Sequence, residues 1–472
     1  MKKYLLLLGL VSLSLASCEK FLEEQPQDFL SADNVYKTEG DAVAGLNGVF
    51  NSFLPQTYYG RTAWQITELP GDLIRVGSTT DERAQLSRFI YTSTNTEINS
   101  WWTNTYRMIN RANDLLENVP GVGMDEARKN AILGNARFLR ALGYFDLVRC
   151  FGEVPLVTAT VKGPADELRP PRAPLAAVYQ QIIDDLTFAE ANCLPENQIP
   201  AGEKGRVSKG AAAALLAKVY LTRAGSTAAQ ASDNQSALDA CNRVIGSGLY
   251  RLLPVYGDVF DPDKENGAEH IFSIQFDLPP NVGSIIVRQF LPSQLSGLGT
   301  FTVEDALVNS YATNDVRRAW NISNQAGTTT LARYYFNKFR DPKRIVNDAR
   351  TNYLITRYAD VLLMQSEALN NLNAGDPSKL TGINAVRARA GLAALTGTTT
   401  KDAFVDLLVK ERAWELCQEG HRFFDLTRLK RLREAVQAAK PTVTVDPKYY
   451  LFPIPQPELL LNPNLTQNPG FD

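Results

Sequence analysis

Apolar residues at helical spacing dominate both ends of the chain and decide its structural class. Between 98 and 118 they recur every three or four positions and form one apolar stripe: Ile98, Trp102, Tyr106, Ile109, Ala112 and Leu116. Pro120-Gly121 ends this helix. The same analysis predicts helices over 125–150, 173–192, 208–224, 233–247, 354–373 and 401–419. The chain is therefore expected to be mostly α.

A run of small residues at the start of the helix at 208–224 predicts close packing between helices. Gly210 is followed by four alanines, and such a face lets two helices approach closely. This favours helix pairs stacked as repeats of about 34 residues, as in tetratricopeptide proteins, over a loose bundle. Because the match to the repeat pattern is degenerate, the pattern alone leaves both architectures open.

Two stretches lack helical periodicity. The segment 251–345 is rich in prolines and glycines, and its alternating stretch 271–276 is typical of a short strand. A second loop-rich stretch, 54–97, contains several aromatic and charged residues. Long loops on a rigid helical scaffold usually carry binding surfaces. We therefore expect a helical region over 18–250, an irregular, substrate-facing region over 251–345 and a second helical region over 346–472.

The first 18 residues have the features of an export signal with a lipid attachment site. Lys2 and Lys3 precede an apolar run from Tyr4 to Leu15, and small residues then lead to Cys18. A cysteine directly after a cleavage site is the residue that bacterial lipoproteins acylate, and the apolar run is too short to span a bilayer. We predict a signal peptide over 1–17 and a lipid anchor on Cys18. An ordinary signal peptide is the alternative.

Charge and cysteine usage exclude several functions. The formal net charge is −2 and no long run of lysine or arginine occurs, so nucleic acid is not an expected partner. The remaining cysteines are too widely spaced for a metal site. We expect them to be small buried hydrophobic residues, although export would permit disulfides: Cys150, Cys193, Cys241 and Cys417.

Known catalytic patterns are missing from the sequence. His270 and His421 belong to no H-E-x-x-H helix, and no G-x-S-x-G motif occurs. The segment 202–209 lacks the G-K-[ST] order of a phosphate loop, which favours a turn with Ser208 as a helix cap. No cofactor is expected.

Two acidic clusters are better explained without catalysis or metal binding. Glu411, Glu415 and Glu419 share one helix face, so they cannot flank a glycosidic bond from two sides. Arg412 and Arg422 are close enough in sequence to pair with them. The second cluster does not have EF-hand spacing, and a solvated loop is favoured over a cation site: Asp258, Asp261, Asp263, Glu265 and Asn266.

The C-terminal part resembles a known family. The stretch from Glu411 to Arg428 is similar to the E-R-x-x-E-L-x-x-E-G-x-R-x-x-D-L-x-R signature of SusD/RagB nutrient-uptake lipoproteins. Other segments match this family in the same order: Asn110-Arg111-Ala112-Asn113, Ala136 to Ala141 with Pro155-Leu156, Arg357 to Met364, Phe452 to Pro455, and Gln467 to Gly470. The resemblance covers essentially the whole mature chain.

The resemblance implies both fold and function. It implies a tetratricopeptide-like α scaffold with an irregular subdomain, anchored by lipid on the outer membrane and facing outwards. It also implies a lid on a SusC-like TonB-dependent transporter that captures an oligosaccharide or another nutrient without catalysis. The signature glutamates and arginines would then form internal ion pairs. A peptide-capturing lid, an anchored glycoside hydrolase and a repeat scaffold that binds only proteins are the alternatives.

Sugar capture needs aromatic platforms with polar groups around them. Trp102 and Trp414 lie on apolar helical faces and are expected in the core, and Trp101 is undecided. Trp64 is the first choice for a platform and Trp320 the second, although a loop tryptophan is often buried. The other expected ligand contacts are chosen by region and chemistry: Tyr58, Tyr59, Asp72, Arg75 and Arg288.

Overall fold

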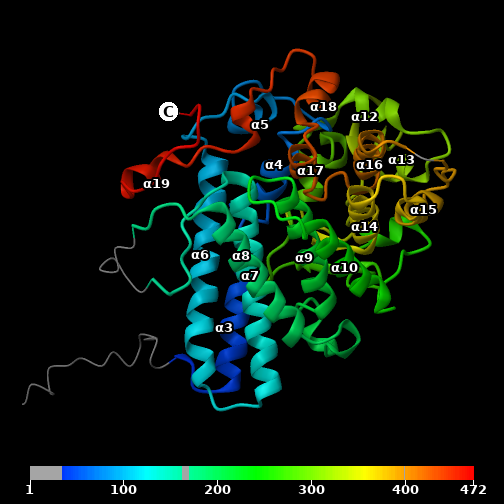
Figure 1. Cartoon of the computed structure of the whole chain (residues 1–472). Helices are drawn as coiled ribbons and strands as arrows, with labels where there is room; N and C mark the ends of the chain where they lie inside the picture. Colours follow the sequence, from blue (N-terminus) through cyan, green and yellow to red (C-terminus); the bar gives the residue numbers. More distant parts are fainter. Residues whose placement is uncertain (1–34, 162–168, 398, 472) are drawn as a thin grey trace, which may run out of the picture.

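The computed structural model describes residues 35–161, 169–397 and 399–471 (Figure 1). The predicted signal peptide and Cys18 lie outside these residues. None of the described helices has the length and apolar character needed to cross a bilayer.

A stack of long helices forms one side of the molecule (Figure 1). Helix α6 packs on α7, α7 on α8, α8 on α9, α9 on α10 and α10 on α14, so neighbours in sequence are neighbours in space up to α10. Helix α3 covers α6 and α7. The bounds are α3 Glu39–Asn51, α6 Thr96–Asn118, α7 Glu126–Phe151, α8 Leu175–Asn192, α9 Lys209–Ala224, α10 Asp233–Gly246 and α14 Tyr358–Leu372.

Local sequence explains where these helices begin and how closely they pack. Ser208 caps α9, because its side chain accepts a hydrogen bond from the Ala211 amide. This agrees with the helix cap that the sequence favoured over a phosphate loop. Ala211 to Ala214 are at most 2% exposed. On α7, a Cβ at Gly143 would lie 2.4 Å from Met108 Cε and 3.1 Å from Ile109 Cγ1 of α6, so a larger residue would require these side chains to shift. The predicted mostly α fold with paired helices is confirmed.

The C-terminal helices pack against α14. Helices α15 and α16 contact α14, and α17 contacts both α16 and α18. Their bounds are α15 Leu380–Arg389, α16 Lys401–Leu416, α17 Arg422–Arg428, α18 Leu432–Ala439 and α19 Gln456–Leu461. The short 3-10 helices are η2 Val119–Gly121, η3 Glu196–Gln198, η4 Ala201–Glu203, η5 Tyr256–Phe260, η6 Ser293–Leu295, η7 Pro377–Lys379 and η8 Pro447–Tyr450.

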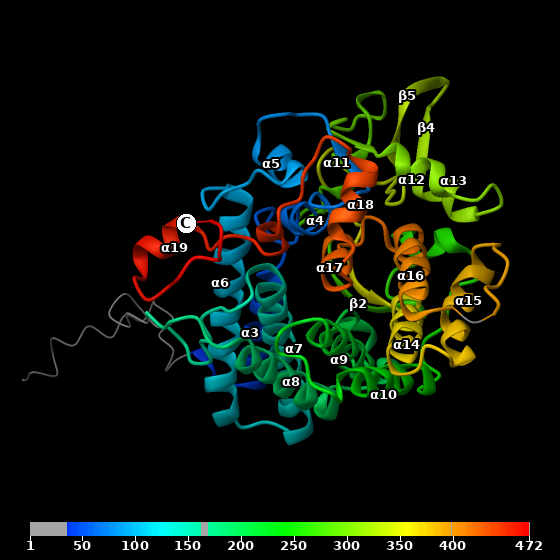
Figure 2. The same cartoon turned by 45° about the horizontal axis from the view of Figure 1, so that its top comes forward.

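Short elements from the two irregular segments form a cap, with α5, α11 and the β4–β5 hairpin at the top of Figure 2. The strands form three antiparallel two-stranded sheets, β1–β3, β2–β6 and β4–β5. Arg75 of β1 lies opposite Thr302 of β3. The bounds are α4 Thr62–Glu68, β1 Ile74–Val76, α5 Glu82–Arg88, β2 His270–Ile274, α11 Ile286–Phe290, β3 Phe301–Val303, α12 Asp305–Ser310, α13 Val316–Asn321, β4 Ile322–Ala326, β5 Thr329–Phe336 and β6 Tyr353–Arg357.

Three details differ from the sequence-based expectation. The stretch 54–97 contains helices α4 and α5, so it is less loop-rich than predicted. The short strand expected over 271–276 is β2, His270–Ile274, which is buried along its whole length because it pairs with β6 and packs on α9. Residues 353–357 form strand β6 instead of the first turn of a helix.

One large apolar core joins the three predicted regions. It includes Phe138 of α7, Phe272 of β2 and Trp414 of α16. A smaller cluster lies between α14, α15 and α16. The regions on either side of the predicted boundaries near 250 and 345 therefore share one core. The division into three regions stays a prediction.

Candidate functional site

Trp64 is buried and cannot serve as a ligand platform in this conformation. It is 1% exposed, and every residue of α4 is buried. Its ring centroid lies 4.8 Å from that of Phe290 on α11 and 4.9 Å from that of Phe301 on β3. The expectation of an exposed loop aromatic is wrong, because this segment is a helix beneath the cap. Trp64 supports the β1–β3 ribbon from below.

Tyr58 and Tyr59 are also core residues, which corrects their assignment as ligand contacts. Their exposures are 0% and 4%, and both rings pack on Trp101. The Tyr59 hydroxyl donates to Asp146 Oδ2 at 2.7 Å. Trp101, which was undecided, is 1% exposed. The predicted burial of Trp102 and Trp414 is confirmed.

Asp72 has a structural partner instead of a free carboxylate. Both of its oxygens accept hydrogen bonds at 2.7 Å from the Arg422 guanidinium, in a bidentate pair. Arg422 lies in the signature segment, so this pair ties the loop after α4 to the C-terminal helices. The assignment of Asp72 as a ligand contact is therefore corrected as well.

Arg75, Arg288 and Trp320 retain some exposure but do not form one site. Arg75 Nη2 lies 2.7 Å from Glu304 Oε2, and its side chain is 28% exposed. Arg288 of α11 donates to Asn347 Oδ1. The Trp320 ring is covered by the Arg340 guanidinium at 3.9 Å, and its indole N–H donates to the Lys338 carbonyl at 3.0 Å. Trp320 is therefore no free platform.

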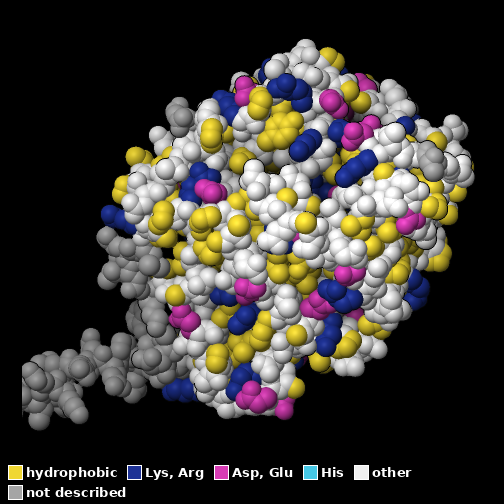
Figure 3. All heavy atoms as spheres, in the orientation of Figure 1, with side chains coloured by type: hydrophobic (Ala, Val, Ile, Leu, Met, Phe, Trp, Pro, Cys, Tyr) yellow, Lys and Arg dark blue, Asp and Glu magenta, His cyan; other side chains and the backbone are white. Residues whose placement is uncertain are grey.

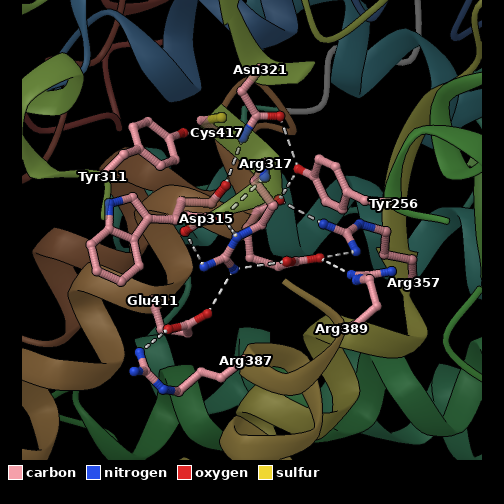
Figure 4. A network of polar contacts seen from close by, with 12 residues as sticks. Tyr256, Tyr311, Asp315, Arg317, Asn321, Arg357, Arg387, Arg389, Glu411 and Cys417 are labelled. Carbon is pink, nitrogen blue, oxygen red and sulfur yellow. Dashed lines mark hydrogen bonds and ion pairs between the residues drawn. The ribbon is translucent and has the colours of Figure 1, made fainter. Parts of the chain in front are cut away.

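The signature glutamates form an ion-pair network with cations from distant segments, and Figure 4 shows the part of it around Glu411, Arg317 and Arg357. Glu415 pairs with Arg357 at 2.6 Å, with Arg317 at 3.0 Å and with Arg389. Glu411 pairs with Arg317 and Arg387. Glu419 pairs with Arg357 and Lys338. The expected internal ion pairs are present.

The partners within this network differ from the expectation. Arg412 pairs with Asp360 at 2.8 Å and with Asp425 at 2.6 Å, whereas Arg422 pairs with Asp72. Burial alone would raise the pKa of Glu415, but Arg389 and the two other arginines hold it well below its usual value. All three carboxyl groups have ion-pair partners and are no more than 2% exposed. They are not available for glycosidic chemistry.

The cysteines and the acidic loop have ordinary surroundings. Cys150, Cys193, Cys241 and Cys417 are buried free thiols, as predicted. In the acidic loop, Asp258 pairs with Lys264, and Asp263 pairs with Lys343 and Arg350. Within 35–161, 169–397 and 399–471, no group of three His, Cys, Asp or Glu side chains is arranged to hold a metal ion.

Part of this acidic loop lines a polar cavity of about 560 Å³, which is the best candidate for ligand binding. The cavity lies between the end of α3 and the segment around β2. Its polar lining consists of side chains that match sugar hydroxyls in hydrogen-bonding capacity: Asn51, Asp263, Glu265, Asn266, Gln275, Asp277, Asn281 and Arg350. Phe276 and Val282 add apolar surface. A volume of this size is typical of small-ligand sites.

Hydrogen bonds hold the deep part of this cavity in place. Gln275 Oε1 accepts from Asn266 at 2.8 Å and from Asn352 at 3.0 Å. One oxygen of Glu265 accepts from the Asn352 amide at 2.7 Å. Burial raises the pKa of Glu265 to about 8, so this side chain is largely protonated at neutral pH and can donate a hydrogen bond. The cavity is therefore preorganised and has both donors and acceptors.

Sequence reasoning found only the acidic loop and missed the rest of the cavity. Gln275, Asp277 and Asn281 follow strand β2, and this polar run after an apolar strand was a usable signal. Asn51 and Arg350 are far from it in sequence, and only the fold brings them together.

A second cavity of about 740 Å³ lies between the helical stack and the C-terminal segment. The ends of α7 and α9, the start of α8, and α17 and η8 contribute to its lining. Over the face shown in Figure 3, Lys and Arg side chains are interspersed with acidic and hydrophobic ones.

Comparison with known proteins identifies the family. The SusD family matches residues 312–471, and a family described as starch-binding and associating with the outer membrane matches residues 20–221. The chain is a SusD-like protein. It is 29% identical to SusD-like protein P2 of Formosa agariphila, with 100% of both chains covered.

Solved structures agree with this assignment over nearly the whole SusD-like chain. A SusD superfamily protein from Parabacteroides distasonis has a TM-score of 0.82 at 29% identity, covering 92% of this chain and 99% of the other. A laminarin-binding SusD-like protein has a TM-score of 0.79 at 29% identity, covering 92% and 100%.

Proposed function

We propose that this SusD-like protein captures an oligosaccharide at the cell surface and acts as a lid for a SusC-like TonB-dependent transporter. Its lipid anchor would be Cys18, on the outer membrane with the folded body facing outwards. The main support is a similarity that spans the chain and includes a laminarin-binding relative. The match to a family described as associating with the outer membrane supports the location.

The polar cavity is the proposed capture site. Sugar hydroxyls both donate and accept hydrogen bonds, and the amides of Asn51 and Asn281 supply both functions. Asn51, Asp277 and Asn281 are exposed, so these groups are reached from solvent. The exposed side chain of Val282 offers an apolar contact to the C–H face of a sugar ring. Arg75 and Arg288 on the cap are the competing contact points.

Calorimetric titration with laminarin-derived and other neutral oligosaccharides tests this location. Asn281→Ala and Asn51→Ala should each weaken binding about tenfold, because each removes a hydrogen-bonding side chain from the cavity. Arg75→Ala is the matched control on the cap. Loss of binding in Arg75→Ala with full binding in both asparagine variants would move the site to the cap.

The anchor and the partner need separate experiments. Cys18→Ala should release the protein from the membrane fraction of cells that lack the transporter. Retention there would contradict the lipid anchor. Co-purification with a SusC-like barrel from membranes would support the lid role, and a protein that purifies alone under gentle extraction would contradict it.

The same titrations separate the alternative functions. Glu265, with its raised pKa, lies in a cavity with Asp263 and Asp277, and a glycoside hydrolase also uses a protonated and an ionised carboxyl group. We expect the recovered oligosaccharide to be intact after incubation. Shortened products would favour the anchored hydrolase, and binding of oligopeptides alone would favour a peptide-capturing lid.

A further inference from the structure

The 740 Å³ cavity between the helical stack and the C-terminal segment is chemically unlike the polar cavity. Its walls are largely apolar and aromatic, with Tyr179 on α8, Phe424 on α17 and Tyr450 on η8. Tyr179 and Phe424 are buried, whereas Tyr450 is half-buried. Among the described residues, the Tyr450 hydroxyl has no hydrogen bond and its ring pairs with no other aromatic ring, although the side chain packs against the main core. The exposed part of the Tyr450 ring lines the cavity and can stack on a ligand there.

Cationic side chains outnumber acidic ones along this cavity. Arg149, Arg428, Lys430 and Arg433 line it, against the single carboxylate of Glu434 among the lining residues. Two of these cations are already neutralised. Arg149 pairs with Asp146 at 2.7 Å, and Arg428 pairs with Asp425 at 2.9 Å and with Glu367.

The other two cations have no acidic partner in the described part of the chain. Arg433 donates through Nε to the Val445 carbonyl at 3.0 Å, and its terminal nitrogens have no protein acceptor among the described residues. The Lys430 ammonium makes no hydrogen bond or ion pair with any of them. Both side chains are exposed, so they lie at the rim where a ligand would enter.

The backbone at Lys430 makes this lysine unusual. Its φ is 58°, in the left-handed region, where it ends helix α17. Its amide donates to the Thr427 carbonyl at 3.1 Å, and the next amide donates to the Leu426 carbonyl at 2.8 Å. Glycine is the favoured residue at such a position. The chain instead has a lysine there, and its ammonium group pairs with no acidic side chain among the described residues.

Hydroxyl groups complete the lining. Thr222, Ser226 and Thr227 come from the end of α9 and the turn after it, and Thr427 comes from α17. Such side chains suit a ligand that is itself rich in hydroxyls.

We propose that this cavity is a second binding site, for an acidic sugar whose carboxylate or sulfate group pairs with Lys430 and Arg433 while a sugar ring stacks on Tyr450. This goes beyond the capture of a neutral oligosaccharide in the polar cavity. A peptide fits less well, because the lining comes from helices, helix ends and turns and offers no strand edge to pair with an extended backbone.

The test is calorimetric titration of the detergent-solubilised full chain with defined probes. Tetragalacturonate carries carboxylates, a carrageenan-derived tetrasaccharide carries sulfates, and laminaritetraose is neutral. We expect at least one acidic probe to bind, with affinity that falls as salt is raised. The probe that binds identifies the acidic group.

Lys430→Gly is the most informative variant. It should weaken the acidic probe about tenfold, while glycine at a left-handed position keeps or raises the melting temperature. Arg433→Gln should have a similar effect on binding. Lys401→Gln is the control, because it removes the same charge from a surface residue of α16 that does not line the cavity.

The outcomes separate this proposal from the capture of neutral sugar. Unchanged acidic-probe affinity in Lys430→Gly and Arg433→Gln, or no binding of either acidic probe, would overturn it. Hexaglutamate binding that depends on the same two residues, with no acidic sugar bound, would assign the cavity to an acidic peptide instead. Laminaritetraose should bind these two variants normally. If laminaritetraose did not bind the unmodified chain, this would contradict neutral-sugar capture in the polar cavity but not the acidic-sugar site.

Discussion

The signature network and the polar cavity are both rich in carboxylates, yet they behave in opposite ways. In the network, Glu415 meets three arginines and is fully buried. In the cavity, Glu265 has one backbone hydrogen bond and faces open space. Arginines hold the pKa of Glu415 down against burial, whereas burial raises the pKa of Glu265 to about 8. In this protein the densely charged signature segment stabilises the packed interior, whereas the more widely spaced acidic residues line a cavity.

The largest expected effect is in the network. Arg357→Ala leaves Glu415 and Glu419 buried without a main partner, and breaking a buried ion pair in this way costs about 3–5 kcal/mol. Urea denaturation should show this loss, or the variant should be recovered only as aggregates. Arg431→Ala, which removes an exposed pair with Asp406, is the control with little effect. Equal stabilities of the two variants would refute the ion-pair network.

Trp64→Ala should be nearly as damaging. It removes a fully buried indole from between Phe290 and Phe301, and truncations of this kind cost about 3–5 kcal/mol. Thermal unfolding measures this effect. A stable variant with weakened sugar binding would instead restore Trp64 as a ligand platform and contradict its burial.

The pH dependence of stability distinguishes the two kinds of carboxyl group. Between its usual value near 4.5 and the folded value near 8, the Glu265 carboxyl ionises in the unfolded chain but keeps its proton in the fold. The free energy of unfolding therefore decreases as pH rises through this window. Glu265→Gln should remove that decrease. The free energy of unfolding of the variant, relative to that of the unmodified chain, should therefore increase between pH 5 and pH 8.

The control for this pH experiment is Asp263→Asn in the same cavity. A hydrogen bond from Arg350 lowers the pKa of Asp263, so this carboxylate stabilises the fold above its usual pKa and that contribution is lost in acid. The stability of Asp263→Asn relative to the unmodified chain should therefore not increase as pH rises. Urea midpoints of both variants and the unmodified chain, measured at pH 5 and pH 8, would show the effect. Identical pH profiles for the two variants would contradict the proposed difference between the Glu265 and Asp263 carboxyl groups.

The smallest effect on stability is expected at the cavity rim. Asn281→Ala removes an exposed side chain whose bond to Asp277 is long, at 3.4 Å, so stability should change by no more than about 0.5 kcal/mol. If its oligosaccharide affinity still falls about tenfold, the cavity is open to ligand. A large loss of stability would mean that the rim is part of the core.

The sequence predicted the helical parts well because helix formation has a local signature. The helix expected over 98–118 spans Thr96–Asn118, and the one expected over 125–150 spans Glu126–Phe151. The internal ion pairs of Glu411, Glu415 and Glu419 were also implied by the family resemblance, although α16 ends at Leu416, so Glu419 lies beyond the helix face that was expected to carry all three. Their partners were not predicted, because Arg317, Arg357 and Arg389 lie in segments that only folding brings near.

The ligand-contact prediction failed where burial depends on distant segments. Tyr58, Tyr59 and Trp64 were indistinguishable in sequence from exposed loop aromatics, yet Phe290, Phe301 and Trp101 cover them. The sequence by itself determined the helices, the capping of α9 by Ser208 and the family, because these depend on neighbours in the chain or on a linear motif. Only the tertiary structure decided which aromatic rings are covered and which polar side chains share a cavity, because solvent exposure is a property of packed segments and not of a segment alone.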